Sequence, residues 1–76
     1  MRISVEESTE FKKDLAFYSI SDERHDRIRD YLGDNPVAGT PHPDDPKLRE
    51  WEVGKEVVTF IFAPEIGAVI LLRIQP

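Results

Sequence analysis

The sequence contains no cysteine, and it has one methionine, one tryptophan and no long apolar run. Without cysteine, neither a disulfide nor a cysteine-ligated metal site can brace the 76-residue chain. A chain of this size buries only about 60% of its unfolded surface. We therefore expect one domain, residues 1–76, that relies on a protein partner for part of its stability. The sequence indicates no cofactor and no metal, and the lack of cysteine fits a reducing cytoplasm.

The chain also lacks a membrane-spanning segment and an excess of positive charge. Its longest apolar run covers residues 68–72, whereas a membrane helix needs roughly 20 residues, and acidic residues near the start predict that no signal peptide is present. The net charge is −5, although nucleic-acid-binding proteins usually carry a basic face. Residues 1–34 hold six Lys/Arg and nine Asp/Glu, and residues 47–76 hold four of each. A basic patch in the second half would therefore be small.

The spacing of apolar residues is helical in the first half of the chain. Residues 1–5 predict a short strand. Ser8 or Thr9 is expected to cap a first helix, and Ser21 is expected to cap a second helix that ends at Gly33. The side chains expected on the inner faces are Phe11, Leu15, Tyr18, Ile28, Tyr31 and Leu32.

The second half of the chain changes to strand-like patterns. Residues 33–47 hold four of the six prolines and predict a long loop, of a kind that tends to be functional or mobile. Gly54 and Lys55 are suited to a tight hairpin turn. Strands are expected over residues 48–53, 57–62 and 69–74. The predicted order is strand–helix–helix–strand–strand–strand, an α+β fold in which two N-terminal helices pack on a small antiparallel sheet.

Several short motifs follow one another in a distinctive order: N-P-x-x-G at residues 35–39, L-R-x-W at residues 48–51 and a closing β-hairpin. The residues concerned are Phe11, Lys12, Lys13, Leu15, Asn35, Pro36, Gly39, Pro41, Lys47, Leu48, Arg49, Trp51, Val53, Gly54 and residues 69–74. This combination, which covers nearly the whole chain, resembles the RelE/ParE toxins of type II toxin–antitoxin systems. The resemblance implies a RelE-like fold, an antitoxin whose C-terminal segment wraps the toxin, and either ribosome-dependent mRNA cleavage or gyrase poisoning.

The sequence departs from that family's pattern in three places. Glu52 lies on the strand before the hairpin turn, where a basic residue is frequent in the family. Glu56 and apolar residues follow the hairpin turn, where the family commonly has an arginine. The RelE branch also continues into a basic tail, whereas Gln75 and Pro76 follow the last predicted strand here. The last two departures favour an alternative, a non-enzymatic binding module that acts on gyrase by contact or that binds only its antitoxin. A third possibility is an unrelated α+β domain whose sheet edge associates with itself.

Cleavage of RNA by its own 2′-hydroxyl needs a proton acceptor, a proton donor and cations that stabilise the phosphorane. The catalytic candidates are Glu50, Glu52 and Arg73, with either glutamate as the proton acceptor. The candidate nucleic-acid contacts are Lys47, Arg49, Lys55 and Trp51. Trp51 suits a base-stacking platform, but its alternation with Val53 favours a core position. His42 is of a residue type that often serves as a general acid or base, yet it falls in the predicted loop.

Apolar residues occupy both faces of the last two predicted strands. Two helices cannot cover so much apolar surface, so we expect an exposed patch or a free edge strand that binds a partner. An antitoxin would cover it by strand addition or by docking a helix in a groove. The other expected partners are the ribosome with mRNA, or gyrase, and a second copy of the chain when no antitoxin is present.

Overall fold

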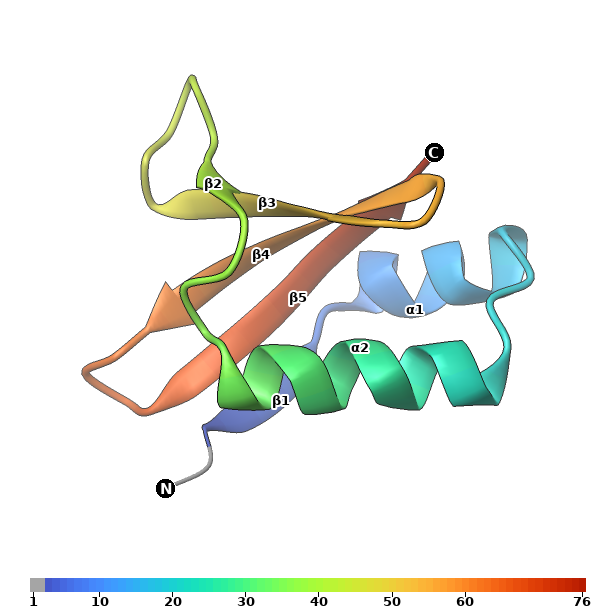
Figure 1. The fold of residues 1–76 in the computed structure, drawn as a ribbon, viewed down its shortest axis with the longest axis horizontal. Helices are drawn as coiled ribbons and strands as arrows, with labels where there is room; N and C mark the ends of the chain where they lie inside the picture. Colours follow the sequence, from blue (N-terminus) through green and yellow to red (C-terminus); the bar gives the residue numbers. More distant parts are fainter. Residues whose placement is uncertain (1–2) are drawn as a thin grey trace.

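Over residues 3–76, the computed structural model contains two helices and a five-stranded sheet (Figure 1). The elements in chain order are β1 (Ser4–Glu7), α1 (Thr9–Phe17), α2 (Asp22–Asp34), β2 (Thr40–Pro41), β3 (Leu48–Val53), β4 (Glu56–Ala63) and β5 (Ala68–Gln75). The predicted α+β class and order of elements are confirmed. The predicted first strand began at Met1, and residues 1–2 lie outside the part that the structure describes.

The sheet is mixed, not wholly antiparallel as predicted. Its strand order is β1-β5-β4-β3-β2, and β3, β4 and β5 form an antiparallel meander. β1 lies parallel to β5, with Glu7 opposite Leu71. The crossover connection that a parallel pair requires is the chain between them, which contains both helices and β2–β4. The short β2 lies within the predicted loop and pairs with Arg49 and Glu50. Two residues are too few to show a strand pattern in the sequence.

Serine side chains cap both helices, as the sequence predicts. The Ser8 hydroxyl accepts a hydrogen bond from the N–H of Phe11 at 3.0 Å, and Ser21 caps α2 in the same way. The prediction that Gly33 ends the second helix is wrong. The N–H of Asn35 still donates to the carbonyl four residues earlier, so Gly33 lies inside the last turn, where it is buried.

Both helices pack on the same face of the sheet (Figure 1). The buried core between them consists of Phe11, Ile28, Leu32, Val58, Phe60, Val69, Leu71 and Ile74. In residues 3–76 no helix covers the opposite face, which we call the open face (Figure 1). Neither helix of the described chain is long or apolar enough to cross a bilayer.

A β-bulge in β5 changes which residues share a face. Phe60 lies opposite Leu71, but the next pair outward is Thr59 with Arg73, so Leu72 is an extra residue without a partner in β4. The bulge keeps apolar side chains on the core face on both sides of the irregularity. It also brings Arg73 level with Thr59.

α1 covers the part of the β5 edge that β1 does not reach. The Ser8 hydroxyl donates to the carbonyl of Leu72 at 2.9 Å. The carboxylate of Asp14 accepts a hydrogen bond from the backbone N–H of Ile74 at 3.0 Å. Ser8, the N-cap of α1, and Asp14, within α1, therefore provide hydrogen-bond partners for the carbonyl of Leu72 and the N–H of Ile74 at this sheet edge.

Candidate functional site

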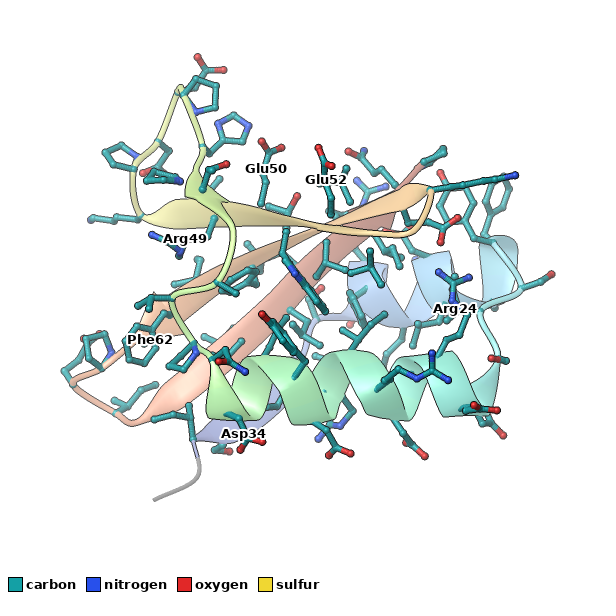
Figure 2. The ribbon with its side chains drawn as sticks, viewed as in Figure 1. Arg24, Asp34, Arg49, Glu50, Glu52 and Phe62 are labelled. Atoms are coloured by element: carbon teal, nitrogen blue, oxygen red, sulfur yellow. The ribbon has the colours of Figure 1, made fainter. Side chains whose placement is uncertain are left out.

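Three polar residues form a row across the open face. Glu50 lies opposite Thr59, and Thr59 lies opposite Arg73. Directly opposed residues point to the same face, and neighbouring strands are about 4.8 Å apart, so the backbones of Glu50 and Arg73 are roughly 10 Å apart. Glu52 follows on the same face of β3, and both glutamates point away from the helices (Figure 2). The predicted proton acceptors and Arg73 therefore belong to one side of the sheet.

The guanidinium of Arg73 turns from this row toward α1. Its Nε donates to Oδ2 of Asp14 at 2.8 Å, and about half of the arginine side chain is exposed. The hydrogen bond from Arg73 holds the pKa of Asp14 below its usual value, with a smaller contribution from the N–H of Ile74, against the opposing effect of burial. The same pair raises the pKa of Arg73. A carboxylate thus already neutralises this cation.

Arg49 points to the helix side of the sheet and holds the chain that leads into β2 (Figure 2). Its guanidinium donates to the carbonyls of Val37, Ala38 and Gly39 at 2.8, 3.0 and 3.1 Å. Three backbone carbonyls therefore occupy the Nε and Nη2 donors, so a phosphate would have to displace them to be held by this edge of the guanidinium.

Replacing Arg49 with lysine is expected to loosen residues 37–39, because an ammonium lacks the planar fork that reaches three carbonyls. The expected loss of stability is about 1 kcal/mol. Hydrogen–deuterium exchange measured by mass spectrometry should become faster in a peptide that spans residues 37–41. Lys47→Ala serves as the control and should leave that exchange unchanged. Equal exchange in Arg49→Lys and the wild type would contradict the assigned role.

The remaining predicted contacts are dispersed, except that Lys47 lines the same hollow as Arg49. Trp51 also points to the helix side, where its ring stacks on Tyr31 with centroids 4.5 Å apart and an interplanar angle of 4°. Lys47 and Lys55 flank opposite ends of the six-residue β3. At about 3.3 Å per residue, they are roughly 20 Å apart and cannot contact the same phosphate. The structure therefore does not gather the four predicted cations into one site.

Neither a protein-family model nor a curated protein matches this sequence. Among solved structures, a chain of the toxin–antitoxin complex RelBE2 from Mycobacterium tuberculosis superposes with a TM-score of 0.78. The alignment covers 99% of this chain and 98% of that chain, at 16% sequence identity. The chain has the RelE-like toxin fold. At the level of the fold, this confirms the resemblance that the motifs indicate.

On this RelE-like fold, His42 joins the open face, which sequence reasoning did not predict. Its Nε2 lies 4.0 Å from Oε2 of Glu50, and its Nδ1 accepts a hydrogen bond from the N–H of Asp44 at 3.1 Å. The pairing of β2 with β3 brings the predicted loop, residues 33–47, next to Glu50. No pattern in the sequence predicts that pairing. In residues 3–76 no three His, Asp or Glu side chains gather as metal ligands would.

Proposed function

We propose that this chain is the toxin component of a type II toxin–antitoxin module, acting in the cytoplasm and held inactive by a cognate antitoxin. The observation that carries the proposal is the RelE-like fold, which extends over 99% of the chain. The open face supports it, because apolar side chains there are only half-buried and no helix covers them in the described residues. They are Leu48, Val57, Ile61 and Ile70. Such a surface favours a protein partner.

We further propose that the toxin acts by contact with its target, with gyrase as the candidate target. Cleavage of RNA would need cations around the phosphate. Arg49 holds loop carbonyls, Arg73 is paired with Asp14, and the two lysines flanking β3 are far apart. The open face also presents two glutamates, which repel phosphate.

Ribosome-dependent mRNA cleavage is the second candidate. The row of Glu50, Thr59 and Arg73, with His42 beside Glu50, favours it. In this mechanism Glu50 or Glu52 would accept the 2′-hydroxyl proton, and Arg73 would stabilise the phosphorane after leaving Asp14. As the P–O5′ bond breaks, the leaving 5′-oxygen would take a proton from His42 beside Glu50.

Expression without a partner is expected to arrest bacterial growth, while cellular transcripts remain uncut. The double variant Glu50→Gln/Glu52→Gln should arrest growth equally, because contact with a target needs no proton acceptor. Growth curves and mapping of transcript 5′ ends measure both effects. Transcripts cut within codons, together with loss of toxicity in the double variant, would establish cleavage instead. Normal growth of cells that contain the folded, soluble protein would refute the toxin assignment.

A further inference from the structure

A groove runs between α2 and the β3–β4 hairpin, on the helix side of the sheet and apart from the open face. Its inner part has a volume of about 180 Å³ and is lined by Arg24, Arg27, Ile28, Tyr31, Trp51 and Val53. Its outer part has a volume of about 370 Å³ and is lined by Arg24, Arg27, Val53, Gly54, Lys55 and Glu56. Three residues line both parts, so the two form one continuous hollow, which we call the α2–β3 groove.

The outer part of the α2–β3 groove is locally positive. Its lining holds three cations, Arg24, Arg27 and Lys55, and one carboxylate, Glu56. With Glu23, the partner of Arg27, these groups sum to +1, in a chain whose net charge is −5. Arg24 pairs with Glu56 across the groove. Arg27 pairs with Glu23 of its own helix, and both side chains are at least 70% exposed. An exposed pair of this kind is weak, so Arg27 exchanges partners at little cost.

The inner part of the groove is apolar and aromatic. Ile28 forms its buried floor, and the stacked rings of Tyr31 and Trp51 form one wall. Tyr31 is 44% exposed, although it belongs to the apolar stripe of α2. Aromatic residues beside arginine are the side chains that most often carry binding energy at protein interfaces. A hollow of this size accepts one large apolar side chain.

The neighbouring sheet edge favours an extended ligand. β2 pairs with Arg49 and Glu50, and Gly39 lies against the backbone of Trp51. Residues 52–53 of β3 pair with β4 on one side and have no strand on the other side in the described chain. A free edge beside a pocket is the arrangement that binds extended peptides, in which main-chain hydrogen bonds give affinity and a pocket selects a side chain.

We propose that the α2–β3 groove binds an extended acidic segment of a partner protein. One large apolar side chain enters the inner part, and adjacent carboxylates contact Arg27 and Lys55. The inference rests on the proposed function in one respect, that the partner would be the antitoxin. Nucleic acid fits less well, because Trp51 already presents one ring face to Tyr31 and the inner part of the groove is lined largely by apolar and aromatic side chains.

Trp51 is the single tryptophan of the chain and lines the groove, so its fluorescence reports binding directly. The probe is a short synthetic peptide with one central leucine flanked by glutamates. We expect it to change the emission, and we expect Arg27→Glu/Lys55→Glu to weaken binding about tenfold. The matched control is Lys12→Glu/Lys13→Glu, which makes the same change of charge on the exposed side of α1 and should bind like the wild type.

Two further probes test the chemistry of the ligand. A peptide with lysines in place of the glutamates should not bind, and one with serine in place of the leucine should bind at least tenfold more weakly. Tyr31→Ala should weaken binding similarly, with thermal melting used to show that the variant is folded. The inference is overturned if the acidic leucine peptide does not bind, if both charge-reversed variants bind it equally, or if a uridine oligonucleotide binds in its place.

These results separate the groove from the proposed function. If expression arrests growth and a co-expressed antitoxin restores it, but the peptide does not bind, the toxin assignment stands and the groove is not the docking site. If the peptide binds but growth is normal, the groove stands as a peptide site and the toxin assignment fails.

Discussion

Replacing Gly39 with alanine should lower the melting temperature by roughly 15 °C, from a loss of about 3 kcal/mol. Gly39 has φ +74°, a conformation that side chains rarely adopt. A Cβ atom there would lie 2.0 Å from the carbonyl oxygen of Glu50, which belongs to the backbone of β3 and cannot move alone. The alanine variant must therefore displace β2 from the sheet edge. Thermal unfolding followed by circular dichroism measures the change.

Gly67→Ala provides the matched control. Gly67 has nearly the same backbone angle, φ +64°, but nothing lies within 4 Å of the position that its Cβ would occupy. The free energy of unfolding of this variant is expected to fall only by the cost of a side chain in the left-handed conformation, about 1 kcal/mol. The melting temperature should then fall by roughly 5 °C. If the two variants melt at the same temperature, the close approach of Gly39 to β3 has no energetic importance.

Replacing Asp14 with alanine should destabilise the protein by about 2–3 kcal/mol, since it leaves the N–H of Ile74 unpaired at a buried position. Asp14 is itself buried, and its carboxylate joins α1 to the edge of β5. It also pairs with Arg73, so both contacts between helix and strand are lost together. Urea unfolding measures the effect. Asp26→Ala, an exposed position in α2, is the control and should change stability little.

The same carboxylate makes stability depend on pH. The pKa of Asp14 in the folded protein lies below its ordinary value of 3.8. Its contribution is therefore fully present above the unfolded pKa and is lost as the pH falls through the lower, folded pKa. Below about pH 4, the melting temperature of the wild type should fall more steeply than that of Asp14→Asn. Parallel curves for the two proteins would show that Asp14 does not contribute to the acid transition.

Glu7 contributes in the same pH range, so the Asp14 variant should retain part of the acid sensitivity. Burial raises the pKa of Glu7, but hydrogen bonds from His25 and Arg29 outweigh it and hold that pKa below 4.5. Arg29 also donates to the carbonyl of Val5 at 2.9 Å, which ties α2 to β1. Protonation of Glu7 would therefore weaken a second junction between helix and sheet.

Much of the fold follows from local patterns in the sequence. Ser8 and Ser21 accept hydrogen bonds from N–H groups in the first turns of the two helices. The strand predicted over residues 48–53 has the same bounds as β3. Gly54, with φ +62°, forms the predicted hairpin turn. These features depend on neighbours in the chain, which is why the sequence reveals them.

The candidate site depends on pairings between distant residues, and these are not visible in local patterns. The row of Glu50, Thr59 and Arg73 exists only because the bulge at Leu72 shifts the register of β5. The partner of Arg73 lies 59 positions earlier in the chain. The sequence identified the relevant residue types, but it could not show that a carboxylate had already neutralised the arginine.

The position of β5 has a consequence for synthesis of the protein. β5 lies between β1 and β4, yet it leaves the ribosome after every other strand, and the contact between Ser8 and Leu72 spans 64 positions. Until β5 emerges, β1 has no neighbouring strand and the apolar side chains of α1 lack much of their core. Closing so long a loop also slows folding. A chain with this topology therefore cannot complete its sheet or its core until β5 has been synthesised.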